Sequence, residues 1–304
     1  MRFDRLPFLL LLLVGCGEWV AYDGTPPSGP GGGTLDEATQ RRLAEVTTYD
    51  HLAFDQVLAR HVVRADAEYV LFDYRGLLAD GESSLLLDQY LAAIAVLKAS
   101  QLEGLEQRLA YWINAYNATV IQGVLAQLPA KVDYQVSEEN FVFFDLPNGR
   151  YGGEVLSLNQ VEHGVIRGDE AHASFIASDD ATRDVMRRLH QELWAGAPVD
   201  ARIHVALNCA ARSCPNLRDQ APYAYRATGL AEQLDQQARG FAASPNKGAG
   251  PDGISVLFES YALDWERTFG SATNFLKNHR EAGLSGINID RFLPYDWTLN
   301  IVVP

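Results

Sequence analysis

The stretch AYWINAYNA occupies residues 110–118, inside a longer helical pattern that runs from Arg108 to Leu125. Asn114 and Asn117 are three residues apart, so they share one face of this helix. Their neighbours are aromatic or apolar, and each buried amide left without a partner would cost about 1–3 kcal/mol. Both amides therefore need partners. Either they tie a loop to this helix, or they face a substrate.

Further helices are predicted on the N-terminal side of this segment. Capping signals and apolar spacing place them over residues 34–46 and 52–63, with a third that opens at Ser83 or Ser84 and ends near Leu97. A β-like run follows at residues 141–144. No internal repeat or second linker interrupts residues 34–304. We expect a single α+β domain over this range, with a helical N-terminal half packed on a small sheet.

The N-terminus predicts export and anchoring. A short apolar run, too short to span a bilayer, is typical of a signal peptide over residues 1–15. LVGC at residues 13–16 resembles the bacterial lipobox, which implies that Cys16 is lipidated; a plain signal peptide that contains a cysteine is the alternative. Residues 16–33 form an anchor and a Gly/Pro-rich linker. Because Gly17 and not Asp follows the cysteine, we expect an outer-membrane location in the cell envelope, facing the periplasm or the surface.

Composition and the missing motifs argue against several classes of partner and cofactor. The 304 residues carry 25 Lys and Arg against 39 Asp and Glu, a formal net charge of −14, with no basic block. This balance argues against binding nucleic acid. No Gly-rich phosphate loop, HExxH or GxSxG motif is present, so we expect no nucleotide or other cofactor. The expected partner is the membrane, through lipidated Cys16, and any protein or peptidoglycan partner stays unidentified.

The segment SLNQVEHGVIR, residues 157–167, predicts a short helix because its first residues have capping-box spacing. Glu162 falls at the edge of the apolar stripe of that helix, where a carboxylate is either an ion-pair anchor or a functional acid. His163 and Arg167 share the opposite side. His163 is a candidate general base, and Arg167 is a candidate substrate-binding residue.

The segment RIHVALNCAARSCP, residues 202–215, offers a nucleophile. Residues 202–208 alternate as a strand would, which places His204 and Asn208 on one face. A loop then leads to Cys214, and Pro215 predicts that a helix starts just after it. A thiol at a helix N-terminus loses its proton more easily, and His204 or His163 could act as its base.

Two other roles compete for the cysteines. Cys209 and Cys214 are the only thiols left once Cys16 is lipidated, and they lie five residues apart in an expected oxidising compartment. A turning loop could therefore join them in a structural disulfide. Otherwise they are inert or bind a metal, but the C-x4-C spacing with no second pair makes zinc the weakest alternative, so we expect no metal.

The segment FLPYDWTLN, residues 292–300, is aromatic for a chain terminus. We expect it to dock on the core as a strand or turn. Asp296 could orient a histidine, cap a helix or face a substrate.

These four segments together resemble a bacterial family known as domain of unknown function 547. The family pattern runs W-I-N-x-Y-N-A, I-E-H-x-I-x-R, H-x-A-L-N-C-x-x-x-S-C-P and Y-D-W-S/T-L-N. This chain has the four motifs in the same order, from about residue 50 to its end, at Trp112–Ala118, Val161–Arg167, His204–Pro215 and Tyr295–Asn300, with Val161 as a conservative difference from the pattern. The resemblance implies a lipid-anchored envelope protein, but no assigned activity. Both cysteines belong to the pattern, which implies a paired or jointly functional role.

Two functions are compatible with these features. The first is a cysteine-dependent hydrolase or acyl transferase in which Cys214 attacks, a histidine takes the proton, and Glu162 or Asp296 orients the imidazole. Asn208 would then help to bind the oxyanion. By analogy this suits a papain-like core, although His204 precedes Cys214, the reverse of the order in papain. The second is a non-catalytic binding domain in which a Cys209–Cys214 disulfide is structural.

Overall fold

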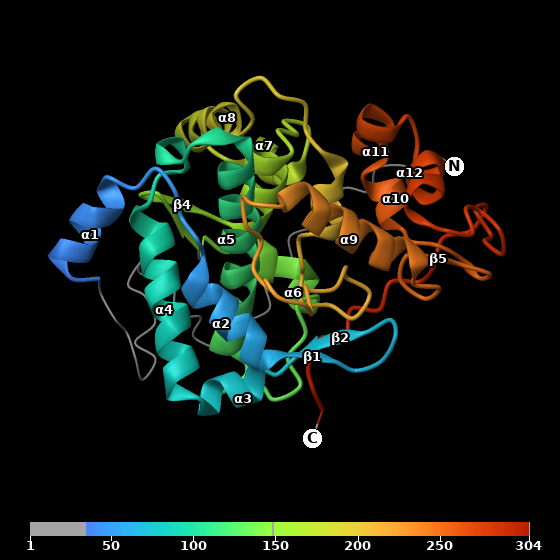
Figure 1. The fold of residues 1–304 in the computed structure, drawn as a ribbon, viewed down its shortest axis with the longest axis horizontal. Helices are drawn as coiled ribbons and strands as arrows, with labels where there is room; N and C mark the ends of the chain where they lie inside the picture. Colours follow the sequence, from blue (N-terminus) through green and yellow to red (C-terminus); the bar gives the residue numbers. More distant parts are fainter. Residues whose placement is uncertain (1–34, 148, 304) are drawn as a thin grey trace, which may run out of the picture.

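Helices dominate both halves of the fold. A computed structural model describes residues 35–147 and 149–303, so the expected signal peptide, Cys16 and the linker lie outside the described residues. Within those ranges, helices accompany three small, two-stranded antiparallel sheets (Figure 1). The α+β class and the single domain are confirmed at this level. The sheet content is split among three hairpins and does not form one platform for the helices.

The elements follow one another closely along the chain. The α-helices are α1 (Glu37–Ala44), α2 (Leu52–His61), α3 (Tyr74–Ala79), α4 (Gly81–Val96), α5 (Gly104–Gln127), α6 (Glu138–Phe141), α7 (Ala173–Ala177), α8 (Asp180–Trp194), α9 (Leu230–Ala243), α10 (Leu257–Ser260), α11 (Ala262–Phe269) and α12 (Ala272–His279). Shorter turns are the 3₁₀ helices η1 (Ala99–Gln101), η2 (Val142–Phe144) and η4 (Ala201–Val205) and the π-helix η3 (Gln160–Ile166). The hairpins are β1 (Val62–Arg64) with β2 (Val70–Phe72), β3 (Gly149–Tyr151) with β4 (Glu154–Leu156), and β5 (Ala249–Gly250) with β6 (Gly253–Ile254).

Helix α5 is the centre of the fold. Every residue from Leu109 to Ile121 is buried. Figure 1 shows this helix enclosed by its neighbours, and it contacts α3, α4, α8 and η3. A helix that is buried on all sides belongs in a core, and its polar side chains must find partners there.

Two asparagines of α5 hold the chain segments that surround it. The Asn114 amide donates to the Tyr225 carbonyl at 2.8 Å and accepts from the Tyr225 N–H at 2.9 Å. The Asn117 amide donates to the Ala206 carbonyl at 3.0 Å and accepts from the Asn208 N–H at 2.9 Å. Each side-chain amide thus donates to one backbone carbonyl and accepts from one backbone N–H. Asn114 thereby holds the loop at Tyr225 against α5, and Asn117 holds the segment 206–208.

Residues 201–206 separate two hydrophobic clusters. Ile203 and Ala206 pack into the main cluster around α5, whereas Ala201 and Val205 pack into a smaller one beneath α9 to α12 that contains Trp265. The predicted strand over 202–208 is wrong, because residues 202–205 belong to the 3₁₀ helix η4 and residues 206–208 form no strand. The alternation reflected two apolar contacts on different sides of a tight turn, and not a half-buried strand.

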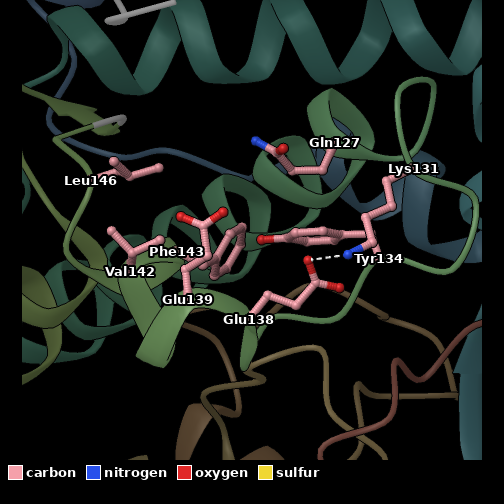
Figure 2. Close-up of a pocket in the computed structure, with 8 residues that line it drawn as sticks. All are labelled: Gln127, Lys131, Tyr134, Glu138, Glu139, Val142, Phe143 and Leu146. Atoms are coloured by element: carbon pink, nitrogen blue, oxygen red, sulfur yellow. Dashed lines mark hydrogen bonds and ion pairs between the residues drawn. The ribbon is translucent and has the colours of Figure 1, made fainter. Parts of the chain in front are cut away.

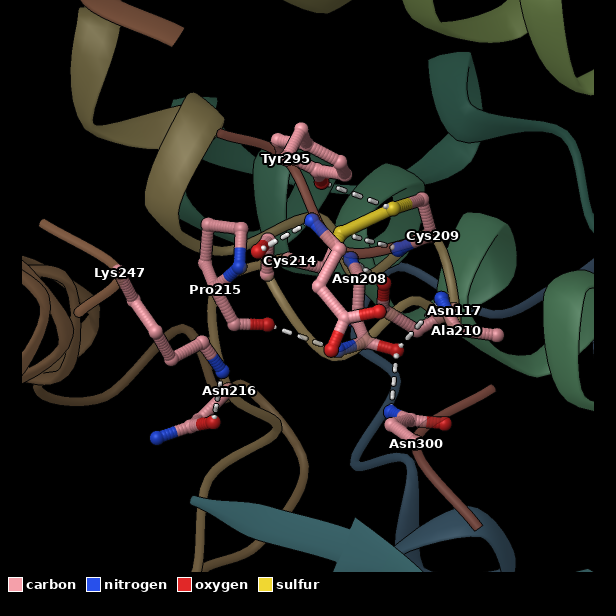
Figure 3. The surroundings of a disulfide bond; sticks show 12 residues. Asn117, Asn208, Cys209, Ala210, Cys214, Pro215, Asn216, Lys247, Tyr295 and Asn300 are labelled. Atoms are coloured by element: carbon pink, nitrogen blue, oxygen red, sulfur yellow. Dashed lines mark hydrogen bonds between the residues drawn. A yellow bond between two sulfur atoms is a disulfide. The ribbon is translucent and has the colours of Figure 1, made fainter. Parts of the chain in front are cut away.

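Two other local predictions are wrong for related reasons. The β-like run 141–144 is not a strand: Val142–Phe144 form the 3₁₀ helix η2, and Phe141 is the last of three left-handed residues, Glu139 to Phe141, with φ between 49° and 66°. No helix follows Cys214, because the backbone after it is tied down by side chains. The Pro215 carbonyl accepts from Asn208 at 2.7 Å, and Asn216 accepts from the Lys247 ammonium at 2.6 Å (Figure 3).

Three of the longer helices lie where they were predicted, whereas α8 and α9 were not predicted from the sequence. α2 and α5 match their predicted ranges closely, although α4 begins earlier because Asp80 caps it rather than Ser83 or Ser84. The C-terminal segment docks as expected. The Asn300 N–H donates to the Ala210 carbonyl at 2.8 Å, and the Phe72 N–H donates to the Asn300 carbonyl at 2.8 Å.

We expect Asn117→Ala to lower the free energy of unfolding by about 2–4 kcal/mol, because a buried N–H and a buried carbonyl both lose their partner. Urea unfolding measures this loss. The matched control is Gln122→Ala on the same helix, since the Gln122 side chain makes no hydrogen bond to the described residues. Equal losses in the two variants would contradict the role of Asn117 as a loop anchor.

Candidate functional site

A half-buried carboxylate, Glu162, lies at the centre of the polar residues that the sequence singled out. It lies on η3, whose start is fixed as predicted by Ser157 and Gln160, each of which accepts from the backbone N–H of the other at 3.2 and 2.9 Å. The hydroxyls of Tyr116 and Tyr261 donate to the two Glu162 oxygens at 2.9 and 2.6 Å. Residues far apart in sequence therefore orient this carboxylate.

The charge of Glu162 has no cationic partner of its own. It forms no ion pair with a lysine or arginine among the described residues. Burial raises its pKa, but the nearby imidazole of His163 and the hydroxyl of Tyr261 lower it, and the net pKa lies below the usual value. Glu162 is therefore ionised at neutral pH.

Beside this carboxylate, four side chains form a continuous chain of hydrogen bonds. His163 Nδ1 lies 2.7 Å from Arg167 Nη1, as expected for residues on one side of the helix. Arg167 Nε donates to Asp264 Oδ2 at 2.7 Å, and the same oxygen lies 3.0 Å from His204 Nε2. Arg167 also forms an ion pair with Asp169 at 3.1 Å. The sequence-predicted residues His163, Arg167 and His204 are thus brought together by Asp264.

Both histidines in this chain are held neutral. Arginine is always a donor, so His163 Nδ1 must accept and the ring carries no charge. Burial lowers the pKa of His163 to about 4. Burial also lowers the pKa of His204, against the opposing effect of Asp264, which accepts its hydrogen bond. For Asp264 burial raises the pKa, but hydrogen bonds from His204 and Arg167 lower it to about 2.

The two cysteines are joined to one another. Cys209 and Cys214 form a disulfide with a Cα–Cα distance of 6.0 Å, inside the usual range for such bonds (Figure 3). Cys214 is buried and its sulfur accepts from the Cys209 N–H at 2.8 Å. Cys209 is half-buried, and its sulfur lies 3.3 Å from the Tyr295 hydroxyl. Ser213, the residue before Cys214, accepts from the Asp296 N–H at 2.8 Å through its hydroxyl.

Cys214 differs from the predicted arrangement in two respects. No helix begins after it, so no helix dipole acts on its sulfur. The candidate bases also have other partners, since His163 bonds to Arg167 and His204 bonds to Asp264. The sulfur itself is bonded to Cys209.

The remaining candidates lie in structural hydrogen bonds. Asn208 donates to the Pro215 carbonyl at 2.7 Å and accepts from the Ala210 N–H at 3.0 Å. Asp296 neither caps a helix nor orients a histidine. It accepts from the Thr298 N–H at 2.9 Å and lies 3.9 Å from Arg212.

Sequence reasoning missed four members of the site: Tyr116, Tyr261, Asp264 and Tyr295. Tyr116 and Tyr295 belong to quoted motifs, so their position beside Asn117 and Asp296 was the available signal. Asp264 and Tyr261 lie on or next to α11 in no recognised motif, and only the packing of α11 against η4 brings them to the site.

Hollows elsewhere do not involve these residues. One of about 160 Å³ lies between the end of α5 and η2, where Glu138 bonds to Lys131 and the ring of Tyr134 projects inward (Figure 2). Another, of about 340 Å³, is lined by Trp112 and Tyr151. Within 35–147 and 149–303, no three His, Cys, Asp or Glu side chains are grouped as a metal ion requires. None of the helices in those ranges is long and apolar enough to cross a membrane.

The free energy of unfolding should fall as the pH drops from about 6.5 to about 4. In that window the unfolded chain protonates His163 and the folded state does not, so stability present above pH 6.5 is lost, by up to about 3 kcal/mol. Asp264 adds a further loss below its unfolded pKa, because its folded pKa is about 2. Urea unfolding at a series of pH values measures the slope.

The matched variant is His163→Gln, whose amide oxygen can still accept from Arg167. It should be less stable than the parent at pH 7 but show a shallower loss between pH 6.5 and 4. An identical slope in the two proteins would show that His163 is not the titrating group.

Comparison with known proteins identifies a family but does not indicate an activity. A family model described as "Protein of unknown function, DUF547" matches residues 99–242. That range includes the motifs at residues 112–118, 161–167 and 204–215 and excludes the one at 295–300. Neither curated proteins nor solved structures gave a match to the chain. The domain therefore contains, at residues 99–242, the region that defines the DUF547 family.

Proposed function

We propose that this protein is a lipid-anchored bacterial envelope protein whose folded domain binds a ligand through the site around Glu162, with the Cys209–Cys214 disulfide as a structural bond. The observation that carries the proposal is the disulfide itself, since it occupies the sulfur that a cysteine hydrolase would need. A resting thiolate at Cys214 is incompatible with that bond.

The disulfide has a structural task in this arrangement. The loop that it closes holds the C-terminal segment, because the Arg212 N–H donates to the Thr298 carbonyl at 2.8 Å and the Ser213 N–H donates to the Asp296 carbonyl at 3.1 Å. Closing a loop of this size stabilises the folded state by about 2 kcal/mol through the lost freedom of the unfolded chain.

The ligand-binding part of the proposal rests on Glu162. A buried charge is costly unless it is paired, and ionised groups without a partner are typical of functional sites. Glu162 is half-buried and ionised, and two tyrosine hydroxyls orient it. Tyr261, which donates to it, is also half-buried, so the site reaches the protein surface.

The anchoring part rests on sequence alone. LVGC at residues 13–16, followed by the Gly/Pro-rich linker, supports lipidation of Cys16 and a domain held away from an outer-membrane surface.

In the untreated lipidated protein, unfolded in guanidinium, we expect no thiol to react with a maleimide probe, and two to react after reduction. Cys16 would carry its lipid, and the other two sulfurs are bonded to each other. Mass spectrometry counts the labels. Two labels before reduction, at Cys209 and Cys214, would overturn the proposal and favour the cysteine hydrolase with a papain-like core.

Single-cysteine variants provide the control. Cys209→Ser should expose one reactive thiol without reductant, and Cys209→Ser and Cys214→Ser should lower the free energy of unfolding by similar amounts, about 2 kcal/mol. A Cys214→Ser protein of parental stability that loses its envelope phenotype would instead indicate chemistry at this sulfur.

We expect Cys16→Ser to move the protein from the membrane fraction to the soluble fraction of a bacterial host, because the lipid would be its attachment. Cell fractionation with immunoblotting measures the shift. Cys209→Ser is the matched control and should remain with the membrane. A Cys16→Ser protein that still sediments with the membrane would rule out the lipid as the anchor.

A further inference from the structure

We propose that the Glu162 site binds ligands that carry a primary ammonium group, which would donate to the carboxylate and rest against the neighbouring aromatic rings. The inference rests on the proposed ligand-binding function and specifies the chemistry of that same site.

The first argument is charge. Three carboxylates, Glu162, Asp169 and Asp264, lie in the site. Against them stand Arg167 and the exposed Arg267, both of which face Asp264 and not Glu162. The histidines add no positive charge at neutral pH, because burial lowers the pKa of His163 and of His204. The site is therefore negative, and a cation would supply the charge that Glu162 lacks.

The second argument is hydrogen-bonding capacity. A carboxylate has about four acceptor positions, and the hydroxyls of Tyr116 and Tyr261 use one on each oxygen of Glu162. Both tyrosines have pKa values raised by burial, so they stay protonated and keep donating. The remaining acceptor positions suit a group with several N–H donors, which a primary ammonium has.

The third argument is the aromatic surface beside the carboxylate. Tyr295, whose hydroxyl lies 3.3 Å from the Cys209 sulfur, has a pKa that burial raises and that the charge of Glu162 raises further. Its ring lies 4.3 Å from Trp297, and Trp297 lies 4.6 Å from Phe141, measured between centroids. All three rings are half-buried, so part of each faces solvent. Aromatic faces next to a carboxylate attract cations.

The left-handed backbone that precedes η2 supports this arrangement. Glu139, Asn140 and Phe141 all have positive φ, a conformation that costs free energy and is found at binding sites. Here it brings Phe141 against Trp297 at the outer end of the aromatic row.

The test is calorimetric titration of the full-length, non-reduced protein with 1,5-diaminopentane and with its neutral isostere 1,5-pentanediol. We expect saturable binding of the diamine and at least tenfold weaker binding of the diol. Glu162→Gln should weaken diamine binding at least tenfold while the variant keeps a cooperative melting transition. The exposed Glu45→Gln, at the C-terminal end of α1, is the matched control and should bind as the parent does.

Trp297→Leu provides a second, independent variant, expected to weaken the diamine severalfold without touching the carboxylate. Equal binding of diol and diamine, or parental affinity in Glu162→Gln, would overturn the choice of an ammonium ligand. So would the absence of diamine binding by the parent protein at millimolar concentration. Each of these results concerns only the chemistry of the ligand. The proposed function is tested separately, by the thiol labelling described above, and a free Cys214 thiol in the untreated protein would overturn it.

Discussion

The fold depends on the two asparagines of α5. Because residues 109–121 of α5 are enclosed on all sides, Asn114 and Asn117 cannot reach water, and their amides are paired with backbone at Tyr225, Ala206 and Asn208. These pairs fix the segment from η4 to the disulfide loop. Glu162 is positioned from the same helix, through Tyr116 one residue before Asn117. One helix therefore specifies both the core and the candidate site.

Sequence periodicity predicted the elements whose stability is local. α2, α5 and the start of η3 carry their own apolar stripes or caps, so their positions follow from spacing alone. η4 was mistaken for a strand because alternation cannot distinguish one half-buried sheet face from a turn between two apolar clusters. The extended backbone after Cys214 depends on Asn208 and Lys247, which reach it from other parts of the fold.

In the candidate site, too, some features follow from the local sequence and others only from tertiary packing. Glu162, His163 and Arg167 share one short helix, so their proximity could be inferred from helical geometry. Asp264 could not be inferred, because it joins His204 to Arg167 only after α11 packs on η4. The carboxylates of Asp264 and Glu162 differ in a way that sequence does not reveal. Asp264 is paired with a guanidinium, whereas Glu162 is surrounded by neutral donors and retains an uncompensated charge.

The docking of the C-terminal segment has a consequence for folding during synthesis. Asn300 bonds to Ala210 and Phe72 through its backbone, and its side chain bonds to Tyr74 and Asn208 in the interior. A chain that emerges from its N-terminus onward cannot complete this core until residue 300 has emerged. If the protein is exported, it would cross the membrane with its core incomplete, and the native fold would form only on the far side.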